Sequence, residues 1–228
     1  MRRLVYLICF IMNIINSGYC NQMVPKDFVY LQDIAPDIKQ DIKYYSQDNF
    51  TGKPVPGYES PVCILTLPAA EALLKIQKEL NQKGLGLKVF DGYRPQMAVK
   101  EFVRWSQDKQ DQKMKALYYP NVNKADFFKL RYVAEQSGHT RGSTVDLTII
   151  DLKTQKELNM GTHFDFMDEL SHPFNSAIGN IANQNRQLLN HVMSKYGFIP
   201  LKPEDTEWWH FTLKDEPFPQ TYFNFPVH

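Results

Sequence analysis

Ser137-Gly-His-Thr-Arg-Gly-Ser-Thr-Val-Asp146-Leu-Thr-Ile-Ile150 joins two candidate metal ligands to a β-branched run. The run over residues 144–150 predicts a strand. An offset of seven would place His139 and Asp146 on opposite faces of an unbroken strand. Gly142 lies between them and permits a turn or bulge, so one of the two can sit in a loop and the other on the strand that follows.

Glu207-Trp-Trp-His210 supplies a second histidine and a second carboxylate further along the chain. Two histidines and one carboxylate can hold a zinc ion and leave its fourth position open for water, whereas a structural zinc site is normally closed by four protein ligands. Glu207 lies three residues before His210, close enough to act as a base on that water. The combination indicates a zinc hydrolase, although the spacing alone is a weak signal because Glu207 and His210 also need a bend to converge.

Apolar periodicity predicts three helices around this run. The first begins at Pro68 and ends at Gly84, the second spans about 96–106, and the third spans about 183–196 and stops at Gly197. Strands are expected over residues 85–90 and 208–213. The side chains expected to face the core are Ala69, Ala72, Leu73, Ile76, Leu80, Ala98, Phe102, Trp105, Leu189, Val192, Met193 and Tyr196.

The remaining segments are interpreted as connections. Residues 21 to about 65 are rich in turn formers and are expected to be mostly loop and short strand. Residues 107–129 are polar and lysine-rich, then aromatic, and are predicted to form a surface excursion. Because helices and strands mix without a regular βαβ alternation, we predict an α+β fold, a single domain with a central antiparallel sheet flanked by helices.

Composition is that of an ordinary soluble globular protein. A chain of 228 residues, 43% apolar and 22% charged, suits one domain with a substantial core. The net charge of +1 gives no reason to expect nucleic acid or an anionic membrane as a partner. The sequence makes no prediction about oligomeric state.

The first twenty residues have the layout of a secretory signal peptide. Arg2-Arg3 precede an apolar run over residues 4–15 and a small-residue exit that ends at Cys20. The run is too short to span a bilayer, which takes about twenty residues. We therefore expect residues 1–20 to be removed and residues 21–228 to be exported to the periplasm or secreted, without stable membrane insertion. Tyr19 stands where a lipobox requires a small residue, which disfavours lipidation at Cys20.

Removal of residues 1–20 would leave 24 basic and 25 acidic residues, a net charge of −1, and Cys63 as the one remaining cysteine. An exported protein with one cysteine cannot form an internal disulfide, so its stability must come from the core and from a bound metal. Cys63 is interpreted as a small buried hydrophobe, because no activating partner is nearby in the sequence.

The chain resembles the zinc D-alanyl-D-alanine peptidases. Residues 137–146 match the motif S-x-H-x-x-G-x-x-x-D, and residues 207–210 match its E-x-x-H half. Within that group the chain is most similar to the D-alanyl-D-alanine dipeptidases associated with vancomycin resistance, and the likeness covers nearly all of residues 27–228. The stretches that carry it are Asn49-Phe-Thr-Gly-Lys-Pro-Val55, Asp91-Gly-Tyr-Arg-Pro95, Met160-Gly-Thr-His-Phe-Asp-Phe-Met-Asp-Glu169, Asp215-Glu-Pro-Phe218 and Phe225-Pro-Val227.

This resemblance implies a hedgehog/DD-peptidase-like fold and one zinc ion per chain, bound by His139, Asp146 and His210. The implied reaction is the hydrolysis of D-Ala-D-Ala to two D-alanines by a zinc-activated water. Glu207 would be the base and Arg94 would stabilise the oxyanion. Ser137 would hold the carboxylate end of the dipeptide and Asp165 its ammonium end. The signal peptide is a departure, since the resistance dipeptidases work in the cytoplasm.

Two other functions remain open from the sequence. A D,D-carboxypeptidase that trims peptidoglycan stem peptides would need an open cleft on the amino side of the scissile bond. A non-catalytic, zinc-stabilised binding protein would need neither Glu207 nor Arg94.

Several residues also have a purely structural interpretation. Arg94 could form a surface ion pair, Asp165 could cap a turn, and Ser137 could be a turn residue. Trp208 and Trp209 are predicted to be packing walls, and Asp168 and Glu169 to lie at a helix N-terminus. The remaining histidines are expected to be surface or satisfied core residues: His163, His172, His191 and His228.

Overall fold

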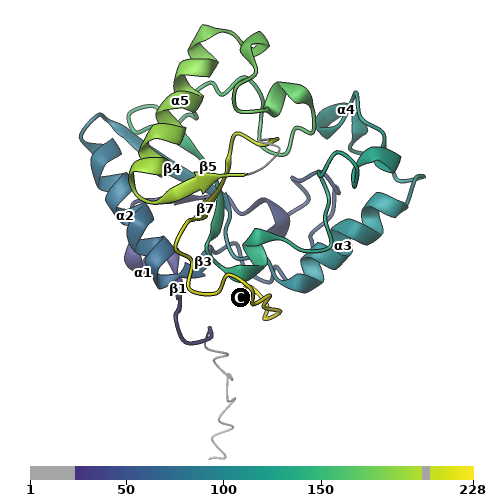
Figure 1. Cartoon of the computed structure of the whole chain (residues 1–228), viewed down its shortest axis with the longest axis horizontal. Coiled ribbons are helices and arrows are strands. Elements are labelled where there is room, and N and C mark those ends of the chain that lie inside the picture. The colour runs from purple at the N-terminus through teal and green to yellow at the C-terminus, as the bar shows by residue number, and fades with distance from the viewer. Residues whose placement is uncertain (1–23, 202–205) are drawn as a thin grey trace, which may run out of the picture.

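The computed structural model describes residues 24–201 and 206–228, and the predicted signal peptide lies outside these residues. A five-stranded sheet with the order β2-β4-β5-β7-β6 forms the centre (Figure 1). Its strands are β2 (Lys39–Gln40), β4 (Leu85–Asp91), β5 (Thr144–Asp151), β7 (His210–Leu213) and β6 (Phe198–Pro200). The predicted α+β class is confirmed. The predicted central antiparallel sheet is confirmed for β4, β5, β7 and β6, and the two-residue edge strand β2 pairs with β4 in parallel.

Strand β5 is the middle strand, and its side chains from Thr144 to Ile150 are all buried. Its register brings distant residues together: Asp146 pairs with His210 of β7 on one side and with Asp91 of β4 on the other. Three polar residues from three strands therefore lie side by side across the sheet.

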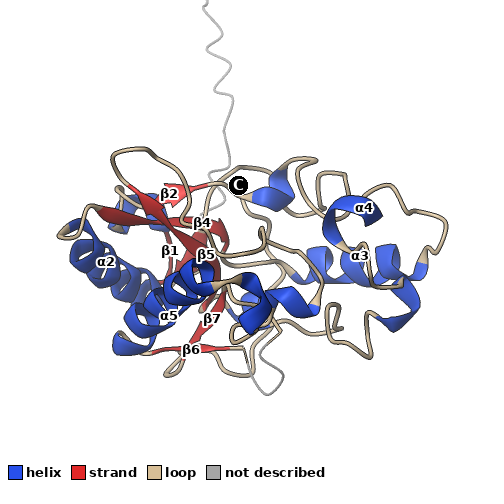
Figure 2. Cartoon of the chain, turned by 90° about the horizontal axis from the view of Figure 1, so that it is seen from above, coloured by secondary structure: helices blue, strands red, loops and turns tan. Residues whose placement is uncertain are grey.

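The three predicted helices are confirmed to within a few residues. They are α2 (Leu67–Asn81), α3 (Gln96–Gln107) and α5 (Asn180–Lys195). Helices α2 and α5 lie on one side of the sheet and α3 on the other (Figure 2), and Lys195 of α5 reaches Glu79 of α2 at 2.7 Å. Gly84 (φ 72°) and Gly197 (φ 88°) follow α2 and α5 in the left-handed conformation, as their role of helix stop requires. Tyr196, predicted to face inward, is half-buried, and its hydroxyl donates to Glu79 (2.9 Å).

Short elements complete the fold. The N-terminal part of the described chain holds β1 (Phe28–Tyr30), α1 (Leu31–Ile34) and β3 (Ile64–Thr66), and β1 pairs with β3 antiparallel. This agrees with the prediction of loop and short strand. Helix α4 (Lys115–Tyr118) lies on the same side as α3 (Figure 2), and 3₁₀ turns cover Lys43–Tyr45, Lys124–Asp126, Gly138–Arg141, Glu169–Ser171 and Ser176–Ile178.

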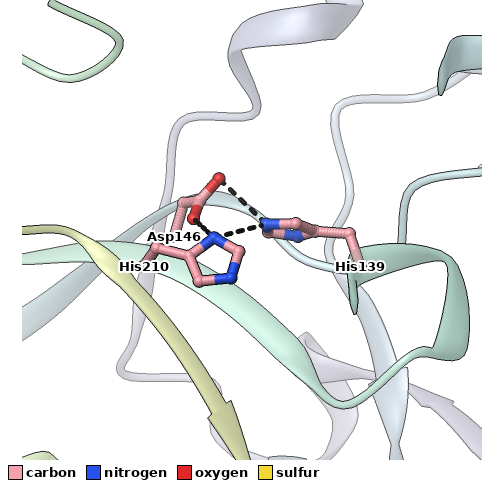
Figure 3. A group of neighbouring side chains, drawn as sticks. All are labelled: His139, Asp146 and His210. Atoms are coloured by element: carbon pink, nitrogen blue, oxygen red, sulfur yellow. Dashed lines mark hydrogen bonds and ion pairs between the residues drawn. The ribbon is translucent and has the colours of Figure 1, made fainter. Parts of the chain in front are cut away.

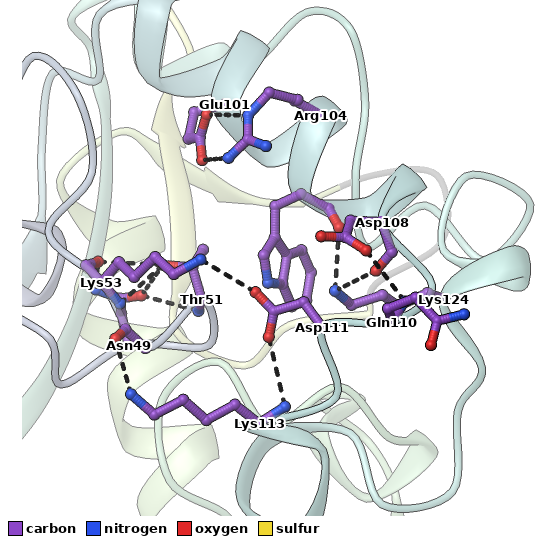
Figure 4. Close-up of polar contacts among 12 residues, drawn as sticks. Asn49, Thr51, Lys53, Glu101, Arg104, Asp108, Gln110, Asp111, Lys113 and Lys124 are labelled. Carbon is purple, nitrogen blue, oxygen red and sulfur yellow. Dashed lines mark hydrogen bonds and ion pairs between the residues drawn. The ribbon is translucent and has the colours of Figure 1, made fainter.

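The prediction of a surface excursion over residues 107–129 is wrong in its aromatic half. Tyr118, Tyr119 and Phe127 are buried. The ammonium of Lys124 donates to the carbonyl oxygens of Trp105 (3.0 Å) and Asp108 (3.1 Å), a contact drawn in Figure 4. The rings of Tyr119 and Phe127 pack against Trp105, so burial of their apolar surface outweighs the polar character of the neighbouring residues.

Cys63 is buried and free, and burial raises the pKa of its thiol well above the ordinary value. Its interpretation as a small buried hydrophobe is confirmed. In the part of the chain that the structure describes, no helix has the length and apolar character needed to cross a membrane.

Candidate metal centre and active site

The side chains of His139, Asp146 and His210 converge in the middle of the sheet (Figure 3). Nε2 of His139 lies 3.2 Å from Oδ2 of Asp146 and 3.2 Å from Nδ1 of His210. Nδ1 of His210 lies 3.1 Å from Oδ1 of Asp146. All three residues are buried. Among residues 24–201 and 206–228 this is the one such cluster of candidate metal ligands.

Local structure explains how His139 and Asp146 meet despite their spacing. His139 lies in the 3₁₀ turn Gly138–Arg141, which the hydroxyl of Ser137 caps by accepting from the amide of His139 (3.3 Å). Gly142 ends that turn with φ 85°, and β5 begins two residues later. A left-handed residue costs glycine little. The predicted turn at Gly142 is therefore confirmed, and it turns the chain so that the two side chains face each other.

The geometry of this cluster fits zinc. Tetrahedral zinc with ligands at about 2.0–2.1 Å has neighbouring ligand atoms about 3.3 Å apart, close to the observed 3.1–3.2 Å. Oδ1 of Asp146 is buried, and its contact with Nδ1 of His210 does not have the geometry of a hydrogen bond. Nδ1 of His139 lies 2.7 Å from the carbonyl oxygen of Gly92, which sets the tautomer that leaves Nε2 unprotonated for a metal. Burial lowers the pKa of the His139 ring, which further favours the neutral form.

The pKa values of Asp146 and His210 are shifted in opposite directions. Burial opposes ionisation of Asp146, but the adjacent His139 and His210 rings outweigh it and hold its pKa below the ordinary value. Burial likewise opposes protonation of His210, but the Asp146 carboxylate raises the pKa of that ring. Both shifts reflect one carboxylate shared by two imidazoles.

Arg94 follows β4 and reaches the cluster from the side. Its Nε donates to Oδ2 of Asp91 (2.9 Å), and its Nη2 lies 3.4 Å from Oδ2 of Asp146. The guanidinium also lies over the rings of Tyr44 and Phe102, 5.1 and 5.2 Å from their centres. Arg94 is thus largely buried in an internal ion pair, and the alternative of a surface pair is wrong.

Asp91 is a residue of this site that the sequence interpretation did not single out. Its carboxylate accepts from the Tyr58 hydroxyl (2.7 Å) and the Gly92 amide (3.0 Å), as well as from Arg94. Its Oδ2 lies 3.5 Å from Nδ1 of His139. An acidic residue three positions before Arg94, at the end of a predicted strand, was the available signal.

Glu207 lies beside the cluster, with Oε2 3.6 Å from Nδ1 of His210. Residues 206–209 bend before β7 begins at His210, which provides the bend that the spacing required. Burial raises the pKa of Glu207 to about 7; Asp146 adds to the rise, while His210 and Arg94 oppose it.

Asp165 lines the same cavity as Glu207. It is buried and has a left-handed backbone (φ 61°), and its carboxylate accepts from the Tyr44 hydroxyl at 2.9 Å. Burial, followed by the nearby Asp146 and Glu207 carboxylates, raises the pKa of Asp165 well above its ordinary value. Such a group would be stabilised in its ionised form by a cation placed next to it.

All the candidate residues line one cavity of about 410 Å³. Its walls include Arg94, Ser137, His139, Asp146, Asp165, Glu207 and His210 together with the aromatic side chains Tyr44, Phe50, Phe102 and Trp209. The structure thus brings together every residue that the sequence proposed for the site.

The residues for which the sequence predicted structural roles have such roles in the fold. Trp208 and Trp209 are buried, and the Asp168 carboxylate caps the turn Glu169–Ser171 by accepting from the Leu170 amide (3.0 Å). Both ring nitrogens of His163 contact backbone carbonyl oxygens. These predictions are confirmed.

Comparison with known proteins finds a matching family model and several similar sequences. The Peptidase M15 family model, described as D-ala-D-ala dipeptidase, matches residues 25–228. A D-alanyl-D-alanine dipeptidase of Enterococcus faecalis is 46% identical over 88% of this chain and 98% of its own length. One from Streptomyces coelicolor is 43% identical over the same shares. A solved structure of a vancomycin resistance D,D-pentapeptidase in complex with Zn(II) aligns with 69% of this chain and 76% of its own, at a TM-score of 0.43 and 18% identity. That last resemblance is too distant to support an inference.

Proposed function

The chain belongs to the D-ala-D-ala dipeptidase family and is a metallo-dipeptidase, and on that premise we propose that it hydrolyses D-Ala-D-Ala to two D-alanines with one zinc ion per chain. The observation that carries the proposal is one cavity in which the three converging metal-type ligands lie beside Glu207 and Arg94. A binding protein would need no base and no oxyanion partner next to its metal.

His139, Asp146 and His210 would hold the zinc ion through Nε2, a carboxylate oxygen and Nδ1. When bound, zinc supplies a Lewis acid that lowers the pKa of water from about 15.7 to about 7. Asp91 and the Gly92 carbonyl oxygen orient the His139 ring from behind, as outer partners of metal-binding histidines do.

Glu207 would take the proton of the attacking water and deliver it to the leaving amine, which requires one carboxylate near both groups. Its position next to His210 supports this role. Arg94 would donate hydrogen bonds to the oxyanion that develops on the scissile carbonyl. Its guanidinium is already oriented by Asp91 and by two aromatic rings, so little reorganisation is needed when the charge appears.

Asp165 and Ser137 would bind the two charged ends of the dipeptide. Burial and the neighbouring carboxylates oppose ionisation of Asp165, so its carboxylate gains from the substrate ammonium, and Tyr44 holds it in place. The hydroxyl of Ser137 lies at the wall of the same cavity and can donate to the substrate carboxylate. A free ammonium requirement would select dipeptides over longer peptides.

The competing function is a D,D-carboxypeptidase acting on stem peptides. The burial of Asp165 favours the dipeptidase, since a long stem peptide has no ammonium to place there. D-alanine release by the purified, zinc-loaded protein from D-Ala-D-Ala and from a stem pentapeptide distinguishes the two. We expect release of D-alanine from the dipeptide alone. Comparable rates on both substrates would establish the carboxypeptidase. No release from either substrate would favour a binding protein.

Export is a separate part of the proposal and is supported by the layout of residues 1–20. An exported enzyme would act on D-Ala-D-Ala outside the cytoplasm. Cell fractionation of the full chain, with mass spectrometry of the mature N-terminus, tests this; a cytoplasmic protein that keeps residues 1–20 would contradict it.

A further inference from the structure

Arg186 of α5 is a buried cation held by backbone carbonyls. It is 3% exposed, and no carboxylate pairs with it in residues 24–201 and 206–228. Its Nε donates to the carbonyl oxygen of Met160 (2.7 Å), Nη1 to that of His172 (2.8 Å) and Nη2 to that of Leu170 (2.9 Å). Burial lowers the pKa of the guanidinium to about 10, so it stays charged at neutral pH. Burying a charge without a counter-ion costs free energy. Here the backbone carbonyl oxygens of a single loop accept hydrogen bonds from the guanidinium and offset that cost.

That loop is the segment 160–172, and Arg186 binds both of its ends. Asp165 lies near the middle with φ 61°, a conformation that is strained for a residue other than glycine and persists only when the surroundings enforce it. Because one rigid guanidinium contacts Met160 at the start and Leu170 and His172 at the end, it closes the loop. The two ends of the loop that carries Asp165 are therefore held by one side chain.

The same network reaches the segment that carries Glu207. The hydroxyl of Thr162 accepts from Nη2 of Arg186 (3.4 Å) and from Nε1 of Trp208 (2.9 Å). The amide of Trp208 donates to the carbonyl oxygen of Ser171 (3.1 Å). The guanidinium also lies 5.7 Å from the centre of a Trp208 ring, within the range of a cation–π contact. Trp208 follows Glu207 directly, so both Asp165 and Glu207 are linked to one side chain.

We propose that Arg186 is a positioning residue that sets the separation between Asp165 and Glu207, and with it the register of the dipeptide in the site. The inference rests on the proposed function, in which Asp165 binds the ammonium and Glu207 acts at the scissile bond. A guanidinium suits this task because its fixed fork of five donors can serve three carbonyls and a hydroxyl at once, which the single ammonium of lysine cannot do.

The test compares two substrates that differ in the distance from ammonium to scissile bond, D-Ala-D-Ala and β-alanyl-D-alanine. The variants are Arg186→Lys, which keeps the charge and loses the fork, and Thr162→Val, which keeps Arg186 and removes the hydroxyl that joins it to Trp208. Asn185→Ala is the matched control, because it removes one hydrogen bond from the same helix to Asn159, just outside the loop. Zinc content and thermal midpoint are measured for each variant, and rates are expressed per zinc-loaded, folded enzyme.

For Arg186→Lys we expect kcat/KM on D-Ala-D-Ala to fall by about 10²-fold, as small misplacements of oriented groups do. The kcat/KM on β-alanyl-D-alanine should fall much less. The ratio of kcat/KM on D-Ala-D-Ala to that on β-alanyl-D-alanine should therefore decrease in Arg186→Lys and, to a smaller degree, in Thr162→Val, and it should stay unchanged in Asn185→Ala. If Arg186 had a merely structural role, its replacement would lower both rates together. An active Arg186→Lys enzyme with an unchanged ratio of the two rates overturns the inference. If Arg186→Lys does not fold, an unchanged ratio in Thr162→Val overturns it instead. If the wild type leaves D-Ala-D-Ala intact, the proposed function fails and this inference with it.

Discussion

Asp91 and Arg94 are joined by a 2.9 Å hydrogen bond from Nε to Oδ2 inside the protein. Oδ2 of Asp91 is also 3.5 Å from Nδ1 of His139. One buried carboxylate thus contacts the proposed oxyanion partner and the ring of a proposed metal ligand. Tyr58 and the Gly92 amide occupy Oδ1, so the carboxylate has little freedom to rotate.

Replacing Asp91 by Asn should therefore harm both stability and activity. The change leaves the Arg94 guanidinium buried with a weaker partner, and breaking a buried ion pair typically costs about 3–5 kcal/mol of unfolding free energy. We expect kcat/KM on D-Ala-D-Ala to drop by about 10²-fold because Arg94 loses its orientation. Urea unfolding and steady-state kinetics measure the two effects. Asp37→Asn, at an exposed position, is the control, and wild-type kinetics in Asp91→Asn would exclude the orienting role.

Glu207→Ala should keep the metal and lose the reaction. We expect kcat to fall by more than the roughly 10²–10⁴-fold typical of a lost general base, because activation of the water depends on the same carboxylate. Turnover and zinc stoichiometry are determined on the same sample. Near-normal turnover in Glu207→Ala would show that the proposed mechanism is wrong.

His139→Ala provides the contrast to that variant. Loss of a ligand should release the zinc itself and lower the thermal midpoint, since metal binding contributes to folding. Chelation of the wild type should lower its midpoint in the same direction, and re-addition of zinc should restore it. A chelated wild type with an unchanged midpoint would speak against a stabilising metal.

Gly142→Ala should destabilise the fold more than Gly84→Ala. Both glycines have positive φ (85° and 72°), so an added Cβ strains the backbone at each. At Gly142 the added Cβ would overlap Cε1 of Phe28, whereas at Gly84 no atom lies within 4 Å of it. We expect a loss of about 1 kcal/mol at Gly84 from strain alone and at least about 1–3 kcal/mol more at Gly142 from overpacking. Equal losses in urea unfolding would contradict the steric argument.

Asp41 should contribute a pH-dependent part of the stability. Its carboxylate lies 2.6 Å from Lys88 and 3.0 Å from Lys43. Burial opposes its ionisation, but the two lysines outweigh it and lower its pKa below 3.8. A depressed folded-state pKa stabilises the protein above the unfolded value, and this stability is lost as the pH falls through the folded pKa.

Asp41→Asn should thus cost about 0.5 kcal/mol at neutral pH, a figure kept small because the side chain is partly exposed. The difference from the wild type should shrink as the pH falls from neutral to below 3.8. Urea unfolding of both proteins across that range measures it. A difference that grows on acidification would reverse the sign of the argument.

Local sequence patterns were enough for the secondary structure that surrounds the site. The apolar spacing of α2, the β-branched run of β5, and the stops at Gly84 and Gly197 depend on residues within a few positions of one another. The burial of Tyr119 and Phe127 could not be predicted locally, because it depends on Trp105, which belongs to another element.

The tertiary structure decided which polar residues share a site. Motif resemblance named His139, Asp146 and His210, but the strand register that pairs Asp146 with His210 and with Asp91 comes from hydrogen bonds between segments far apart in the chain. Arg186 has no local signature, and Asp91 has only its place three residues before Arg94, since the role of each depends on partners brought together by folding. Periodicity and turn chemistry are properties of neighbouring residues, so the sequence alone determines them, whereas pairing across the sheet is determined by the packing of the whole chain.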